Sequence, residues 1–327
     1  MRWLLFLGLT LLAGCAPQWL EPGEPVEPPT ITPHAYVTPD GVALPLRIWP
    51  AQGKLEAVVL ALHGMNDHST AFALPAAFWA ARGVTTYAYD QRGFGGAPHH
   101  GRWPGANALV VDAKRMAAQL RARHPGVPLY LLGESMGAAI ALLATSGPAP
   151  APVDGAILSA PAVWGGNAMS LVYRLPLWFA AHLMPQGKVS GRGLQRWASD
   201  NVDILRGLGR DPLFIKETRI DTVYGVTGLM GTAYDSAELA KVPLLVLYGA
   251  RDEIIPPEPV REFIGRLPVP RRVAYYGLGC HMLMRDLEAE AVWRDIRAWI
   301  ADRAAPLSGG TELPKTAKCR PQGWPVG

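Results

Sequence analysis

One serine in this sequence has the neighbours that a catalytic nucleophile requires. Ser135 lies in the motif Gly-Glu-Ser-Met-Gly at residues 133–137, after the apolar run 129–132 and before a run of small apolar residues. This pattern predicts a strand, a sharp turn and a helix, with the two glycines allowing strand and helix to approach closely. The helix N-terminus also favours a developing negative charge at the turn. We interpret Ser135 as a nucleophile; the alternative is an ordinary turn serine.

A serine hydroxyl becomes nucleophilic when a base takes its proton, and the base needs a carboxylate that orients it. Where a serine occupies such a turn, the acid and then the histidine follow it along the chain. Asp252 follows an apolar run and is the expected acid, with the adjacent Glu253 as its rival. His281 follows a later predicted strand and is the expected base. The other downstream histidine, His182, lies in an apolar stretch away from the strand ends.

Acyl transfer also needs two backbone N–H donors for the oxyanion. We expect one from Met136, directly after the nucleophile, and one from Met65, in the polar loop after the strand 57–62. Amides serve here whatever their side chains are. We expect no metal and no cofactor, because the paired histidines at 99 and 100 have no further metal-ligand residues beside them.

Strand-like and helix-like stretches alternate along most of the chain. The predicted strands are 42–49, 57–62, 84–89, the run that leads to Ser135, 153–159, 242–248 and 271–276, and the predicted helices are 72–82, 106–123, 259–266 and 286–301. This alternation predicts an α/β protein with a mostly parallel sheet and helices on both faces. It lapses between about 162 and 240, which we interpret as a cap inserted above the carboxyl edge of the sheet.

The composition is that of a folded globular protein. The 327 residues are 49% hydrophobic, so a sizeable core is available. The formal charge of +4 is spread along the chain without a Lys/Arg block, and we therefore expect no nucleic-acid partner.

The first 15 residues have the pattern of a secretory signal peptide, with Arg2 before a short apolar run and small residues before Cys15. Leu-Ala-Gly-Cys resembles the lipobox of bacterial lipoproteins. That resemblance implies a lipid on Cys15 and a protein held in the bacterial cell envelope, with Ala16 favouring the outer membrane, facing the periplasm. The alternative is an ordinary secretory signal in which Cys15 is incidental. The proline-rich residues 16–34 are predicted to form an extended tether.

We assign the catalytic domain to residues 35–303, and the Pro-, Gly- and Lys-containing residues 304–327 are predicted to form a loose tail. Cys280 and Cys319 could pair in an oxidising compartment, but their spacing does not decide this. We expect two free thiols.

Five motifs in order carry a family resemblance. They are Leu-His-Gly-Met-Asn-Asp-His-Ser at 62–69, Tyr-Asp-Gln-Arg-Gly-Phe-Gly at 89–95, Gly-Glu-Ser-Met-Gly at 133–137, Gly-Ala-Arg-Asp at 249–252 and Gly-Cys-His at 279–281. Together they resemble the monoacylglycerol lipase and lysophospholipase group of α/β-hydrolases, which is also catalogued with the serine aminopeptidases. The resemblance covers roughly residues 40–300 and implies an α/β-hydrolase fold and ester hydrolysis. Two positions depart from it: Asp67 stands where the group often has Glu, and Glu134 where it often has His. The cap matches poorly.

Three functions are weighed against one another. The first is hydrolysis of monoacylglycerol- or lysophospholipid-like esters, with Trp178, Phe179 and His182 of the apolar cap as candidate pocket residues and the membrane as a partner through Cys15. The second is an aminopeptidase, and the third a non-catalytic, membrane-tethered binding protein on the same fold. The sequence does not indicate the oligomeric state, the acyl length or the head group.

Overall fold

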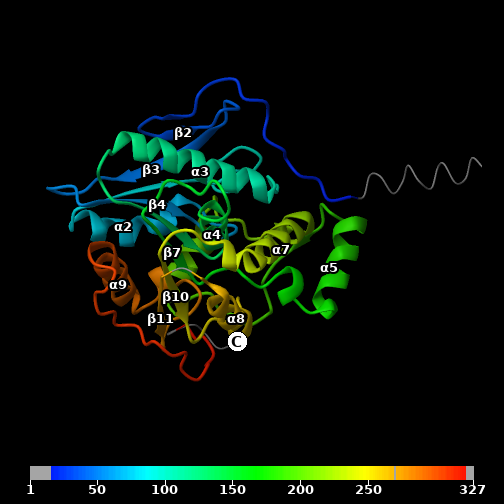
Figure 1. Ribbon diagram of the computed structural model, residues 1–327. Helices are drawn as coiled ribbons and strands as arrows, with labels where there is room; N and C mark the ends of the chain where they lie inside the picture. Colours follow the sequence, from blue (N-terminus) through cyan, green and yellow to red (C-terminus); the bar gives the residue numbers. More distant parts are fainter. Residues whose placement is uncertain (1–15, 269, 322–327) are drawn as a thin grey trace, which may run out of the picture.

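The computed structural model of the protein describes residues 16–268 and 270–321 (Figure 1). The predicted signal peptide and the lipobox with Cys15 lie outside these residues. A nine-stranded sheet runs in the order β1-β2-β3-β5-β4-β6-β7-β10-β11, and its strands are β1 (Thr30–Ile31), β2 (Ala35–Val37), β3 (Ala43–Trp49), β4 (Ala57–Leu62), β5 (Val84–Tyr89), β6 (Leu129–Glu134), β7 (Gly155–Ser159), β10 (Leu244–Gly249) and β11 (Arg271–Tyr276). Six neighbouring strands, β5, β4, β6, β7, β10 and β11, run parallel to one another. The remaining strands β1, β2 and β3 lie beside β5, and each pairs antiparallel with its neighbours.

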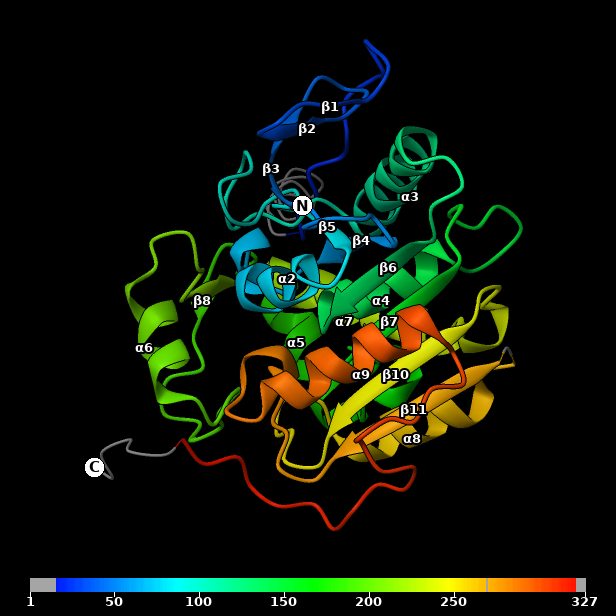
Figure 2. The same ribbon diagram turned by 90° about the vertical axis from the view of Figure 1, so that its left-hand side faces the viewer.

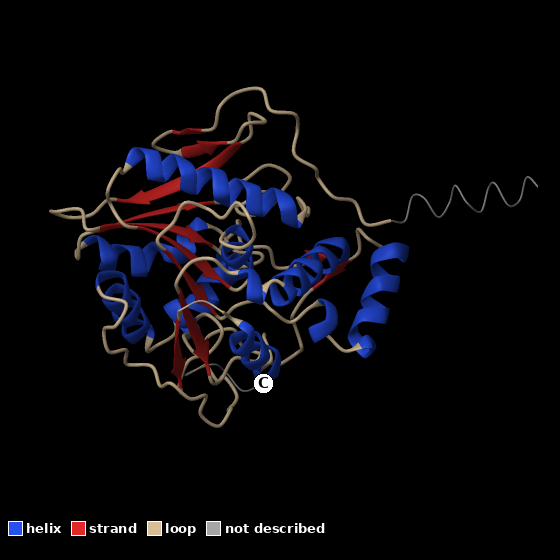
Figure 3. Ribbon diagram, in the orientation of Figure 1, coloured by secondary structure: helices blue, strands red, loops and turns tan. Residues whose placement is uncertain are grey.

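Helices cover both faces of the sheet (Figures 2 and 3). One face carries α3 (Ala106–Arg123), α4 (Met136–Ala144) and α8 (Pro257–Arg266), and the other carries α2 (Ala73–Ala80) and α9 (Ala289–Ala301). Alternate residues of β4 enter the two cores: Val58 and Leu60 pack on the first side, Val59 and Ala61 on the second. Because both faces are buried, the central strands have continuous apolar sequences.

Most predicted core elements lie where the sequence placed them. The strands β4, β5 and β11 and the helix α3 have the predicted bounds, and the others differ at their ends. For β4 the agreement follows from a continuous apolar run, which a strand buried on both faces requires, and for α3 it follows from an apolar stripe with helical period.

The N-terminal segment differs from the extended tether expected over residues 16–34. Its chain follows the domain surface: the amide of Leu20 donates to Trp103 O at 3.0 Å, and the Trp19 ring stacks on Tyr224 with centroids 6.3 Å apart. The strands β1 and β2 then extend the sheet. The stacking of Trp19 and the pairing of β2 with the edge of β3 explain why this proline-rich segment docks.

The cap lies between β7 and β10. It contains the short helices η2 (Gly166–Ala168) and η3 (Ala237–Leu239), the strands β8 (Lys188–Val189) and β9 (Thr218–Arg219), and the helices α5 (Leu171–Leu183), α6 (Val202–Arg210) and α7 (Ile220–Asp235). Helix α7 packs against α4 and carries α5 on its other side. Among the helices within residues 16–268 and 270–321, none has both the length and the apolar character needed to cross a membrane.

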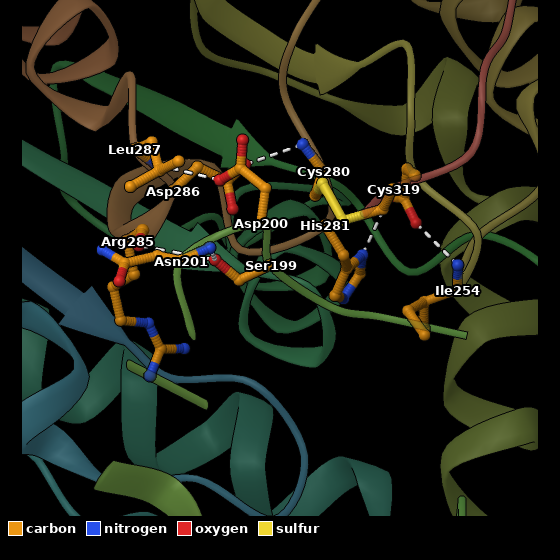
Figure 4. The surroundings of a disulfide bond; sticks show 11 residues. Ser199, Asp200, Asn201, Ile254, Cys280, His281, Arg285, Asp286, Leu287 and Cys319 are labelled. Atoms are coloured by element: carbon orange, nitrogen blue, oxygen red, sulfur yellow. Dashed lines mark hydrogen bonds and ion pairs between the residues drawn. A yellow bond between two sulfur atoms is a disulfide. The ribbon is translucent and has the colours of Figure 1, made fainter. Parts of the chain in front are cut away.

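The C-terminal segment contradicts two expectations, the loose tail and the two free thiols. Cys280 and Cys319 form a disulfide bond, and both are fully buried (Figure 4). Ser308 and Gly309 donate backbone hydrogen bonds to Asp295, at 2.8 and 3.0 Å. The thiol prediction was wrong because a separation of 39 residues says nothing about how two Cβ atoms face each other.

Candidate active site

The nucleophile turn has the strained geometry predicted for it. Ser135 has φ 54° and ψ −115°, a positive-φ conformation outside the regions that residues with a side chain normally adopt. It stands between β6 and α4 and is half-buried. A Cβ on Gly137 would overlap the carbonyl oxygen of Leu62, and one on Gly133 would overlap that of Gly137. Both glycines are therefore required for strand and helix to meet at this turn.

His281 and Asp252 form a buried pair. The Nδ1 atom of His281 lies 2.8 Å from Asp252 Oδ2, which leaves Nε2 as the ring nitrogen available for proton transfer. The other carboxylate oxygen, Oδ1, accepts hydrogen bonds from the amides of Ile254 and Ile255, at 2.8 and 3.0 Å. Asp252 is thus fixed from both sides.

The rival acid Glu253 does not share this position. Its backbone carbonyl accepts a hydrogen bond from Arg196, and its buried Oε2 has no hydrogen-bond partner within the described ranges. The structure therefore brings Asp252, and not its neighbour, to the histidine. The catalytic roles themselves remain predictions.

Strand register brings all three residues to one edge of the sheet. Glu134 pairs with Ser159 on β7, Ser159 pairs with Leu247 on β10, and Leu247 pairs with Ala274 on β11. The proposed nucleophile, acid and base follow these aligned strand ends, which is where α/β proteins carry their sites. At Gly249 the His281 loop approaches so closely that a Cβ would overlap the carbonyl oxygens of residues 279 and 280.

The predicted oxyanion donors also lie at this edge. Met136 is the first residue of α4, so its amide has no intrahelical acceptor. In the loop that carries Met65, Gly64 lies close to the nucleophile: a Cβ there would be 3.4 Å from Ser135 Cβ. The cap holds this loop, because Ile215 donates to Asn66 O at 2.9 Å.

Electrostatics favour the charged form of the proposed base. Burial by itself would lower the pKa of His281, but the hydrogen-bonded Asp252 carboxylate, with smaller contributions from Glu134 and Asp286, raises it above the ordinary value. An imidazole that gains a proton during the reaction is stabilised by this environment.

Two groups near the histidine were missed by sequence reasoning. Arg285 makes ion pairs with Glu134 and Asp67, each at 2.7 Å. Asp286 accepts the amide of Cys280 at 2.7 Å, and burial raises the pKa of its carboxyl to about 7 (Figure 4). The only sequence signal was that Asp67 and Glu134 depart from the usual residues.

Asp286 also belongs to a cluster of metal-ligand residue types. A ligand atom of Asp200 and the sulfur of Cys280 lie within 4.8 Å of its carboxylate. The sulfur is part of the disulfide, so it offers no thiolate to an ion.

The candidate pocket residues of α5 lie mostly at the surface. Trp178 lines a cavity of about 550 Å³ between α3, α5 and α7, whose lining includes no triad residue. His182 stacks on Trp178 with centroids 4.2 Å apart, and Phe179 is 54% exposed. Ala181 is the one buried residue of α5. Most large apolar side chains of this helix are therefore exposed and not packed onto the core.

Together, the sheet, the strained serine turn and the acid–histidine pair at its carboxyl edge define an α/β-hydrolase. A family model described as serine aminopeptidase, S33, matches residues 53–288, and the chain belongs to this family. The predicted α/β-hydrolase fold is therefore confirmed.

Known relatives and a solved structure agree with this assignment. A monoacylglycerol lipase of Mycolicibacterium smegmatis is 26% identical over 292 residues, covering 83% of this chain and 97% of that protein. A monoglyceride lipase of Homo sapiens is 25% identical over 298 residues, covering 86% and 93%. A soluble variant of monoglyceride lipase from Saccharomyces cerevisiae, in complex with a substrate analog, shares the fold with a TM-score of 0.71 at 19% identity, covering 87% and 99%.

Proposed function

We propose that this protein is a serine hydrolase that cleaves monoacylglycerol- or lysophospholipid-like esters through an acyl-enzyme on Ser135. The observation that carries the proposal is the strained serine turn at the same sheet edge as the buried Asp252–His281 pair. The monoglyceride lipase relatives support a carboxylic ester hydrolase.

The reaction follows from the roles of these groups. His281 Nε2 takes the hydroxyl proton as Ser135 Oγ attacks the ester carbonyl carbon, and the amides of Met65 and Met136 bind the resulting oxyanion. The imidazolium then gives its proton to the departing alcohol. Water, activated by the same imidazole, attacks the acyl-enzyme and releases the fatty acid. Asp252 holds the ring orientation throughout.

Aminopeptidase activity is the second candidate, and the description of the family model favours it. Such an enzyme needs an acidic group that binds the substrate's ammonium group. Glu134 and Asp67 are the buried acids beside the nucleophile turn and its oxyanion loop, and Arg285 already forms an ion pair with each. Because both carboxylates are already paired with Arg285, they are not free to bind a substrate's ammonium group, and this favours the esterase. A non-catalytic binding protein would not need the strain stored at Ser135.

Labelling with a fluorophosphonate tests the mechanism directly. We expect the wild type to be labelled and Ser135→Ala to remain folded and unlabelled. Ser170→Ala, at the exposed N-terminal end of α5, is the matched control and should label like the wild type. A folded Ser135→Ala protein that still reacts would refute the assignment.

Substrate class is tested with p-nitrophenyl esters of graded length and with alanyl and prolyl amides. We expect a higher kcat/KM for medium acyl chains than for acetate, because each buried methylene contributes about 0.8 kcal/mol. An amide that is cleaved faster than every ester would support the aminopeptidase instead.

We also propose that the protein is anchored to the membrane through a lipid on Cys15, with α5 facing the bilayer. Large apolar side chains of α5 are exposed, among them Leu171, Leu175 and Phe179. Trp19 lines the same cavity as the first two of these residues. Cys15 precedes Trp19 by four residues, and a chain of that length reaches about 14 Å at most. A lipid on Cys15 would therefore enter the bilayer beside this helix.

Two experiments test the anchoring. Cys15→Ser should move the protein from the membrane to the soluble fraction, and labelled palmitate should enter only the wild type. Separately, Phe179→Glu should weaken binding of the protein lacking residues 1–15 to anionic vesicles, whereas Leu239→Glu, at a similarly exposed residue of η3, should not. If the wild type is unlabelled and freely soluble, the anchor is refuted, and residues 1–15 are interpreted as an ordinary secretory signal.

A further inference from the structure

A buried group of three charged side chains adjoins the nucleophile turn, and acyl transfer by the triad does not use it. One guanidinium nitrogen, Arg285 Nη2, lies 2.7 Å from Glu134 Oε2 and 2.7 Å from Asp67 Oδ2. The arginine side chain is 6% exposed, and each carboxylate side chain is 3% exposed. Solvent therefore screens these interactions very little.

Each member of this cluster belongs to a different catalytic segment. Glu134 is the last residue of β6 and directly precedes Ser135. Asp67 lies two residues after Met65, in the loop expected to supply an oxyanion donor. Arg285 ends the short helix η4 (Leu283–Arg285), four residues after His281. One side chain thus connects the nucleophile turn, the oxyanion loop and the histidine loop.

The cluster is poorly explained as a device for stability. Buried ion pairs rarely repay the desolvation of both partners, and here two carboxylates share one cation. Within the described part of the chain, Glu134 Oε1, Asp67 Oδ2 and Arg285 Nε have no hydrogen-bond partner, so that Arg285 holds Glu134 by a hydrogen bond and Asp67 by charge alone. Burial raises the pKa of Glu134, although Arg285 opposes this effect. Costly buried charge of this kind is characteristic of functional sites.

The sequence departures point to the same cluster. Asp67 and Glu134 are the two motif positions that differ from the residues usual in the resembling group, and Arg285 binds both. The two departures are therefore coupled through one guanidinium, although 67 residues separate them.

We propose that Arg285 is a positioning residue that holds the nucleophile turn, the oxyanion loop and the His281 loop in their catalytic arrangement by binding Glu134 and Asp67 together. This inference rests on the proposed serine hydrolase function. We call the cluster of Arg285, Glu134 and Asp67 the clamp. Its loss allows the oxyanion donors and the base to shift relative to Ser135, and a misplacement of about 1 Å costs on the order of a hundredfold in rate.

Glu134 has a second effect, through its charge. Three carboxylates act on the charge of His281: Asp252, which binds its ring at 2.8 Å, Glu134, which directly precedes Ser135, and Asp286, which accepts the amide of the preceding Cys280. Arg285 is the cation paired with Glu134. Each carboxylate raises the pKa of the imidazole. Glu134→Gln removes one of these charges, so the imidazole stays neutral to lower pH and the acid limb of kcat/KM moves toward lower pH.

The test uses a variant in which the whole cluster is uncharged, R285M/E134Q/D67N, because Arg285→Met alone leaves two buried carboxylates unpaired. Arg285→Lys supplies a conservative replacement. Arg294→Met is the matched control, since Arg294 makes an exposed ion pair on α9. Each protein is measured for kcat and KM on p-nitrophenyl butyrate and for amide hydrogen exchange in peptides covering 63–69 and 280–286. For Glu134→Gln and the wild type, kcat/KM is also measured as a function of pH.

For the uncharged variant we expect a folded protein, kcat lower by about tenfold or more, KM within about threefold, and faster exchange in both peptides but not in the sheet. Arg285→Lys should fall between this variant and the wild type. The clamp is overturned by an uncharged variant with wild-type kcat and wild-type exchange, and the electrostatic effect by an acid limb that Glu134→Gln does not move. If the wild type shows neither labelling nor turnover, the proposed function fails, while hydrogen exchange still tests the clamp.

Discussion

Removing the Cys280–Cys319 disulfide should destabilise the protein without abolishing catalysis. The bond closes a loop with a sequence separation of 39 residues, for which the loop-closure entropy of the unfolded chain gives about 4 kcal/mol at 25 °C. A folded chain of roughly 300 residues has an unfolding entropy of about 0.6 kcal/mol/K, so Tm should fall by about 6 °C at most. The tail keeps its backbone hydrogen bonds at Ser308 and Gly309, which makes this value an upper limit.

Catalysis should survive because His281 is held independently of the sulfur bond. Its ring binds Asp252, and the amide of the preceding residue, Cys280, donates to Asp286 Oδ2 at 2.7 Å. We therefore expect Cys319→Ser to keep kcat on p-nitrophenyl butyrate within a few-fold of the wild type at 25 °C.

The assay is thermal unfolding with and without reductant, alongside thiol titration of the denatured protein. Cys319→Ser should melt at the temperature of the reduced wild type and should not respond to reductant. Lys318→Ser, at the neighbouring exposed residue, keeps the disulfide and should melt like the wild type. The reasoning is refuted if oxidised wild type and Cys319→Ser melt within 1 °C of each other. It is also refuted if the denatured, oxidised wild type has free thiols at both Cys280 and Cys319.

Three further outcomes test the site. Asp252→Asn should lower kcat by about 10⁴-fold in steady-state ester hydrolysis, because the imidazole loses the partner that sets its tautomer; a loss below tenfold would contradict the acid assignment. Gly137→Ala should prevent folding or lower the unfolding free energy by more than about 3 kcal/mol in denaturant titration, because its Cβ would overlap Leu62 O, whereas Gly228→Ala, where a Cβ meets no atom within 4 Å, should be neutral or stabilising. Asp286→Asn should raise Tm above the wild type at pH 8 and progressively less toward pH 4. The folded-state pKa of Asp286 is raised from 3.8 to about 7, so its stabilising contribution is complete below the unfolded pKa and is lost as pH rises through 7; an equal Tm difference at both pH values would contradict this sign.

Local sequence patterns were sufficient to predict the core, and they indicated a candidate triad whose acid and histidine the structure brings together. Ser135 lies between two glycines that no other residue could replace in the turn, and Asp252 and His281 lie three and five residues after the ends of β10 and β11. In a parallel sheet, residues at strand ends meet at one edge whatever the length of chain between them. For that reason, the residues of the candidate site could be predicted to lie together from the sequence alone.

Other features depended on the direction in which side chains point, which periodicity does not specify. The apolar composition of α5 was evident, but its exposure follows from how the helix lies on α7, with Ala181 as its one buried residue. The docking of Trp19 beside Tyr224 likewise depends on a surface made by distant parts of the chain.

The sequence by itself was enough to predict the α/β-hydrolase fold, the candidate nucleophile with its acid and base, and the cap as an insertion, because apolar runs, the glycines of the serine turn and the order of the motifs are local features of the chain. Only the tertiary structure decided the pairing of Cys280 with Cys319 and the cluster in which Arg285 joins Glu134 to Asp67. These contacts connect residues far apart in the chain through the positions of two or three atoms. Such positions are set by the packing of the whole domain, and no local pattern carries that information.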